Sequence, residues 1–206
     1  MSSPDRMVHL RRWAETMSRG HGYAGVFNHQ TTENKDIVEL STADEWCNSV
    51  AAEFNLSVAE LGLNRPDPPD CYVIVGGKRL GVELVQLVER MHKQRAAQGE
   101  TPFAGRLFAD MQWSKGRLVS RLNDIILEKS ERYDGKKINV DVLLIHTGEP
   151  WLTSKQAQAW LEDVSFQPTA NIANAFLLFD YEPGMDHWPV LRLFGDLGGT
   201  QQSRCK

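Results

Sequence analysis

The sequence predicts an α/β fold in which a mixed central β-sheet is flanked by helices. The βαβ-like order between Ile138 and Tyr181 is typical of such a sheet. Cys71 to Leu87 is predicted to be a β-hairpin with a glycine turn, and about Ser114 to Tyr133 an amphipathic helix. Together these segments indicate one globular α/β domain.

The composition of the chain is that of an ordinary globular protein. Its 206 residues are 41% hydrophobic and 24% charged. No apolar run reaches the ~20 residues that span a bilayer, and the N-terminus lacks an apolar signal core. Cys47, Cys71 and Cys205 are too far apart to indicate a disulfide set or a zinc site. We therefore expect a cytoplasmic protein with reduced thiols and no membrane partner.

Three parts are expected along the chain. Residues 1–41 combine an N-terminal helix with an irregular extension, residues 42–195 form the α/β domain, and residues 196–206 form a disordered tail. Leu56 to Asp70, rich in proline and acid, is predicted to be a linker.

The remaining elements are predicted in chain order. A helix is expected to begin at Thr42, because Thr42 and Glu45 have the spacing of a capping box. The later elements are a strand at 138–146, a helix at 153–164 and closing strands at 174–181 and 189–194.

The hairpin is predicted to carry two acids on one face. With the turn centred on Gly77-Lys78, Tyr72 lies opposite Glu83, and Asp70 is then a diagonal neighbour of Glu83. The other face is entirely apolar: Cys71, Val73, Val75, Leu80, Val82 and Leu84.

Two like charges held this close repel, and a bound divalent cation is the usual way to offset them. Carboxylate oxygens suit a hard ion such as Mg²⁺ or Mn²⁺. The other interpretation is that Asp70 and Glu83 are solvated acids, each paired with a nearby Lys or Arg. Both interpretations remain open from the sequence.

Pro69-Asp70, followed by twelve residues and then Glu83-Leu84-Val85, resembles the motif of the PD-(D/E)XK nuclease superfamily. The resemblance implies a restriction-endonuclease-like core at 42–195 and magnesium-dependent phosphodiester hydrolysis. It also implies that Asp70, Glu83 and the backbone carbonyl of Leu84 bind the metal. The implied partner is nucleic acid, DNA in preference to RNA, and a homodimer is one assembly that such enzymes adopt.

The chain departs from this motif at one position, because Val85 stands where the family has lysine. Lys129 is a candidate replacement, since it falls within about 20° of the centre of the apolar stripe of its helix. A lysine there needs a carboxylate partner, unless it reaches out to water near the helix end. Lys129 and Tyr133 also resemble, with lysine for glutamine, a Gln-x-x-x-Tyr pattern of RecB-like members.

Glu53 is a third candidate acid. It falls on the flank of the apolar stripe of the helix that precedes the hairpin. Superfamily members often supply a glutamate to the metal from that helix. The alternative is that Glu53 is a boundary residue that reaches water.

The charge distribution bears on the partner. The net charge is −4, but residues 78–137 hold 13 Lys or Arg against 8 Asp or Glu. That basic segment would suit contacts with a phosphate backbone. The alternative is that this segment is basic only because helices carry Lys and Arg on their solvent-exposed faces.

A second function is also open: a catalytically inactive nuclease fold that serves as a binding or assembly module. The absence of the strand lysine favours this function.

Overall fold

A computed structural model describes residues 32–66, 68–88, 98 and 112–197, with side chains described from residue 35 onward. The predicted N-terminal helix lies outside these residues, as does most of the predicted tail. Among the described helices, none is long and apolar enough to cross a bilayer.

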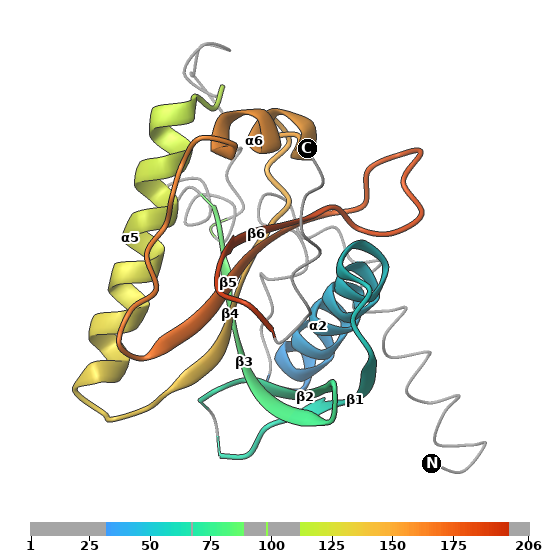
Figure 1. The fold of residues 1–206 in the computed structure, drawn as a ribbon, viewed down its shortest axis with the longest axis vertical. Helices are drawn as coiled ribbons and strands as arrows, with labels where there is room; N and C mark the ends of the chain where they lie inside the picture. Colours follow the sequence, from blue (N-terminus) through green and yellow to red (C-terminus); the bar gives the residue numbers. More distant parts are fainter. Residues whose placement is uncertain (1–31, 67, 89–97, 99–111, 198–206) are drawn as a thin grey trace.

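The described residues form a six-stranded mixed sheet, as the sequence predicts (Figure 1). The strand order β1-β2-β3-β4-β5-β6 is also the order along the chain. β1 to β3 pair antiparallel, β3 to β5 run parallel, and β6 returns antiparallel to β5. The strands are β1 (Val58–Leu63), β2 (Cys71–Val75), β3 (Lys78–Gln86), β4 (Val140–Thr147), β5 (Ile172–Phe179) and β6 (Val190–Phe194).

Helices cover both faces of the sheet. α2 (Thr32–Phe54) lies on one face, and α5 (Lys115–Asp134) and α6 (Ser154–Leu161) pack with the other face (Figure 1). On the α2 side, the fully buried Trp46 meets Phe176 edge-on, with 5.5 Å between ring centroids. The prediction of a mixed sheet flanked by helices is therefore confirmed.

α5 begins and ends within a residue or so of the predicted positions. Ser114 is its N-cap, and its hydroxyl accepts a hydrogen bond from the backbone N–H of Arg117 at 3.3 Å. The buried stripe is the one that the periodicity predicts: Leu118, Leu122, Ile125, Ile126 and Tyr133.

The predicted helix start at Thr42 is wrong. α2 begins ten residues earlier, and no glycine or proline interrupts its 23 residues. The Thr42 hydroxyl donates to the carbonyl oxygen of Val38 at 2.8 Å, which is the bond that a threonine inside a helix makes. The expected domain boundary between residues 41 and 42 therefore falls within α2.

The predicted linker from Leu56 to Asp70 contains a strand. β1 is an edge strand whose side chains are all exposed or half-buried, so no alternating pattern marks it in the sequence. Gly62 lies opposite Tyr72, and a Cβ atom at Gly62 would approach that ring to 2.7 Å. Glycine is needed there because the aromatic ring of β2 lies across β1.

The hairpin register differs by two residues from the prediction. The turn is Gly76-Gly77, both with positive φ (57° and 81°), and Val75 pairs directly with Lys78. A shift of two leaves each side chain on its predicted face, so the apolar face is confirmed. The same register, extended by one residue beyond β2, puts Asp70 opposite Glu83 instead of diagonal to it.

Candidate functional site

The two acids of the hairpin meet in a buried position. Asp70 lies directly before β2 and is 5% exposed, while Glu83 lies within β3 and is 4% exposed. Asp70 Oδ2 accepts a hydrogen bond from the backbone N–H of Leu84 at 2.8 Å. This bond fixes the Asp70 carboxylate against β3, next to Glu83.

α5 supplies two partners to Glu83. Lys129 Nζ lies 2.7 Å from Glu83 Oε1 and forms an ion pair with it, and the Tyr133 hydroxyl donates to the same oxygen. Lys129 thus points inward, as its place on the apolar stripe predicts. Burial, and then the hydrogen bond to Glu83, raise the pKa of Tyr133, so this hydroxyl keeps its proton.

The pKa of Glu83 reflects two opposing influences. Burial raises the pKa of Glu83, while the Lys129 ammonium lowers it and the charge of Asp70 raises it further. The net direction is upward. The alternative interpretation, two solvated acids paired with basic residues, is therefore wrong about solvation, because both acids are buried, although each does have a lysine partner.

α2 supplies a lysine and a third acid. Lys35 Nζ lies 2.9 Å from Glu39 Oε1 and 3.2 Å from Asp70 Oδ1, so it bridges the two carboxylates. Glu39 is 6% exposed. Burial, and then the charge of Asp70, raise the pKa of Glu39 to about 7, although Lys35 opposes both.

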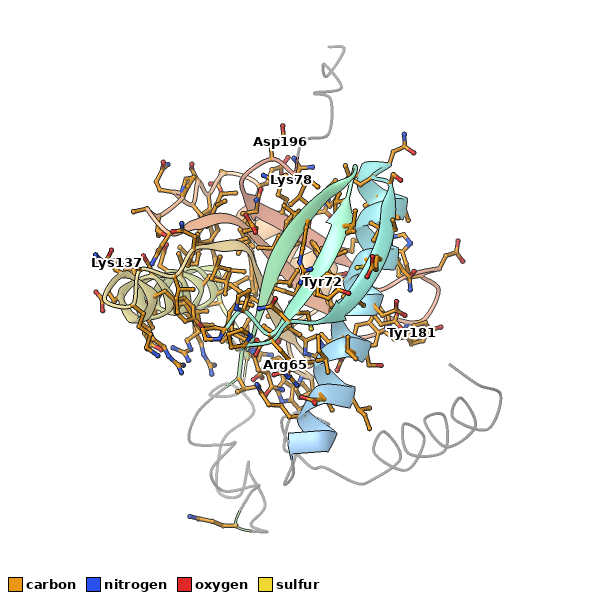
Figure 2. The ribbon with its side chains drawn as sticks, turned by 90° about the horizontal axis from the view of Figure 1, so that it is seen from below. Arg65, Tyr72, Lys78, Lys137, Tyr181 and Asp196 are labelled. Atoms are coloured by element: carbon orange, nitrogen blue, oxygen red, sulfur yellow. The ribbon has the colours of Figure 1, made fainter. Side chains whose placement is uncertain are left out.

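We call Glu39, Asp70 and Glu83 with Lys35 and Lys129 the acid cluster. Its α2 side is held to the β1–β2 connection by an ion pair between Arg65 and Asp36 at 2.8 Å. Figure 2 shows Arg65 at one end of the hairpin and Lys78 at the other.

The structure does not bring Glu53 to the acid cluster. Its Oε1 lies 2.9 Å from Nε2 of His187, in the connection between β5 and β6. Glu53 is fourteen residues after Glu39, which is about 21 Å along a helix. α2, the helix that precedes the hairpin, does contribute a glutamate to the acid cluster. This glutamate is Glu39, from the second turn of α2, and not Glu53, from its last turn.

The acid cluster offers oxygen atoms to a cation. Oε2 of Glu83 and Oε2 of Glu39 are buried and have no hydrogen-bond partner among the described residues. A buried carboxylate oxygen without a partner is costly, and a hard cation would satisfy it. The donor chemistry therefore fits Mg²⁺ or Mn²⁺.

The number of protein ligands is small. In the described part of the chain, no three Asp, Glu, His or Cys side chains are placed to hold an ion between them. Mg²⁺ commonly uses one or two carboxylates and takes its other ligands from water and substrate phosphates. Asp70 and Glu83 would be the two carboxylates of such an arrangement, and the Leu84 carbonyl stays a predicted third ligand.

Gly81 leaves room for Pro69, the residue directly before Asp70. Its N–H donates to Asp141 Oδ2 at 2.8 Å, and a Cβ atom there would lie 2.6 Å from Pro69 Cγ. We expect Gly81→Ala to displace Pro69 and lower the free energy of unfolding by about 1–3 kcal/mol, as overpacking does. Urea denaturation measures this loss.

The matched control is Gly116→Ala in the first turn of α5, where a Cβ atom would meet nothing within 4 Å. It should leave stability equal or slightly higher, because alanine favours helix. Equal stability of the Gly81 and Gly116 variants would contradict the close approach of Pro69.

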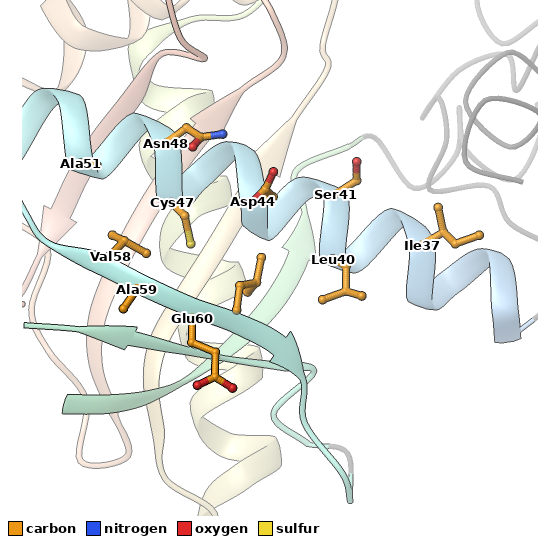
Figure 3. Close-up of a pocket in the computed structure, with 11 residues that line it drawn as sticks. Ile37, Leu40, Ser41, Asp44, Cys47, Asn48, Ala51, Val58, Ala59 and Glu60 are labelled. Atoms are coloured by element: carbon orange, nitrogen blue, oxygen red, sulfur yellow. The ribbon is translucent and has the colours of Figure 1, made fainter. Parts of the chain in front are cut away.

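One hollow in the described part of the chain has no lysine or arginine among its lining residues. It has a volume of about 550 Å³ and lies between α2 and β1 (Figure 3). Its lining includes Asp44 and Glu60 and no lysine or arginine. Such a surface repels phosphate, so it adds nothing to a site for nucleic acid.

No family model, no curated protein and no solved structure matches this chain. The function must therefore be argued from the acid cluster itself.

Proposed function

We propose that this chain is a metal-dependent nuclease that hydrolyses phosphodiester bonds of nucleic acid, DNA in preference to RNA. The observation that carries the proposal is the ion pair between Lys129 and Glu83, with Asp70 held alongside by the Leu84 N–H. A PD-(D/E)XK site needs two acids and a lysine close together. Here the lysine comes from α5 and not from β3.

The fold supports the same proposal. A restriction-endonuclease-like core has a mixed sheet with helices on both faces, and this chain has α2 on one face and α5 with α6 on the other. Asp70 directly precedes β2, and Glu83 lies on β3, the antiparallel neighbour of β2, which is compatible with the motif.

Asp70, Glu83 and Lys129, together with the neighbouring Tyr133, have distinct roles in this reaction. A bound Mg²⁺ or Mn²⁺ would polarise the phosphate and lower the pKa of a bound water. Asp70 and Glu83 would hold the ion, and Lys129 would orient the water and offset the negative charge that develops on the phosphate. Tyr133 keeps the Glu83 carboxylate turned toward Lys129 through its hydrogen bond.

The test is plasmid nicking in Mg²⁺ or Mn²⁺. We expect Asp70→Asn and Glu83→Gln to lower the rate by at least about 100-fold, because each removes a negatively charged ligand with little change of shape. Lys78→Ala is the control, since this exposed lysine lies at the hairpin turn, away from the acid cluster. Equal rates in the wild type and the two acid variants would refute the proposal.

The second candidate is a nuclease fold that binds or assembles without cleaving. Two observations favour it: Val85 stands at the strand position of the lysine, and Lys35 and Lys129 already neutralise the carboxylates without a metal. Calorimetric titration with Mn²⁺ separates the two functions. A folded protein that binds no Mn²⁺ at millimolar concentration supports the second one.

A further inference from the structure

A pocket of about 310 Å³ opens beside the acid cluster, between β3 and α5. Lys129 lines this pocket and also contacts Glu83, so the two features share a side chain. A substrate that occupies the pocket would therefore lie next to the candidate metal site. The lining residues are Val85, Gln86, Val88, Arg121, Ile125, Glu128, Lys129 and Arg132.

The rim of the pocket is basic. Arg121, Lys129 and Arg132 come from one face of α5, at spacings of eight and three residues. The acid among the lining residues, Glu128, lies 3.9 Å from Arg121 and offsets only part of this charge. Arg132 is exposed and forms no ion pair with a described residue.

One side of the pocket is apolar. Val85 and Val88 come from the end of β3 and the residues after it, and the buried Ile125 comes from α5. Val85 is the residue that stands in place of the family lysine. Its side chain here forms part of the surface on which an aromatic ring could pack.

We propose that this pocket binds one unpaired nucleotide of a single-stranded nucleic acid. The base packs against Val85, Val88 and Ile125, and the flanking phosphates contact Arg121 and Arg132. The inference rests on the proposed nuclease function, because it names the substrate of that same site. It also accounts for a valine at position 85, where a lysine would put a charge into the wall that receives the base.

The shape of the pocket selects against duplex. A concave pocket of this size can enclose a small ring, as ligand pockets do. A base inside a duplex is stacked and paired, and it must be extruded at a cost before it can enter such a pocket. A single strand offers its bases without that cost, and its phosphates still meet the arginines.

The test is fluorescence anisotropy with the full-length protein in EDTA. The probe is a labelled 12-nucleotide oligothymidine, and the competitors are an unlabelled 12-base-pair duplex and a 12-unit abasic strand. We expect the duplex and the abasic strand to compete at least about fivefold less well than unlabelled oligothymidine, because one packed base contributes that much to binding.

The variants are Arg121→Ala with Arg132→Ala, and Lys78→Ala as the control. The double variant should weaken binding at least tenfold and reduce the slope of log affinity against log salt by about 1.4, since each phosphate contact on a single strand contributes about 0.7. Lys78→Ala should bind as the wild type does. Unchanged affinity in the double variant, or equal competition by the abasic strand or the duplex, would overturn the inference.

These readouts are independent of cleavage. The Asp70→Asn variant should bind the oligothymidine as the wild type does, because binding is measured without a divalent ion. Normal binding in a protein that, in Mg²⁺ or Mn²⁺, cleaves neither plasmid nor the oligothymidine would refute the nuclease and leave the proposed nucleotide pocket intact. If the wild type nicks plasmid but the Arg121→Ala, Arg132→Ala double variant binds the oligothymidine as tightly as the wild type does, the pocket proposal is refuted and the nuclease proposal stands.

Discussion

We expect Lys129→Met to lower the free energy of unfolding by about 3–5 kcal/mol at pH 8, which is the cost of removing one partner of a buried ion pair. The side chains of Lys129 and Glu83 are only 14% and 6% exposed, so water would replace the ammonium group only incompletely. Methionine fills a similar volume, and the loss therefore reports the uncompensated charge of Glu83. Urea denaturation at several pH values measures it.

The loss should shrink as the pH falls toward 5. The folded-state pKa of Glu83 is already raised, and removing Lys129 raises it further, since this lysine lowers it now. Because the folded-state pKa of Glu83 is raised above its unfolded value, the folded state takes up a proton at a higher pH than the unfolded state does. Lowering the pH therefore removes the uncompensated charge and reduces the stability lost by the variant. An equal loss at pH 5 and pH 8 would contradict this account.

Two further variants isolate the pair. Adding Glu83→Gln to Lys129→Met removes the buried charge, so the double variant should recover most of the lost stability. Lys136→Met changes an exposed lysine just after α5, and it should alter stability by no more than about 0.5 kcal/mol. A double variant as unstable as Lys129→Met would show that packing, and not charge, is responsible.

The second large effect is a pH dependence that originates in Glu39. Its pKa is about 7 in the folded protein against 4.5 for the ordinary side chain, so the folded state holds this proton more tightly than the unfolded state. Its contribution to stability is complete below about pH 4.5 and is lost as the pH rises through about 7. The loss is at most about 3.5 kcal/mol, because one pKa unit corresponds to about 1.4 kcal/mol.

Glu39→Gln should remove this dependence. The difference in unfolding free energy between the variant and the wild type should therefore move in favour of the variant between pH 5 and pH 8. Thermal or urea denaturation across that range gives the difference directly. The control is Glu131→Gln, on the exposed face of α5. Its unfolding free energy should depend on pH as that of the wild type does. Parallel curves for Glu39→Gln would mean that Glu39 is ionised throughout.

Periodicity and turn chemistry predict most of the fold. α5, β4 and the β2–β3 hairpin each have a clear apolar pattern and a clear end, such as Ser114 or Gly76-Gly77. α2 and β1 lack such signals. α2 begins with a polar run, Thr32 to Asp36, and β1 is an exposed edge strand, so only packing against the rest of the sheet stabilises them as helix and strand.

The candidate site could be predicted only in part for the same reason. Asp70, Glu83 and Lys129 lie on elements with readable periodicity, and the structure brings them together. Glu39 and Lys35 lie in the segment of α2 that was expected to be irregular, so no face could be assigned to them. Glu53 lies in the second half of α2, where the apolar periodicity is clear, but at the end of the helix that is far from the acid cluster.

The agreement between strand order and chain order has a consequence for synthesis on the ribosome. Each strand can pair with the one made just before it, so Asp70 and Glu83 are placed as soon as β3 joins β2. Lys129 follows Glu83 by 46 residues, which is about 2–9 s of translation at ordinary rates. We expect Glu83 to stay in water during that interval, because the helix that buries this acid is the one that carries Lys129.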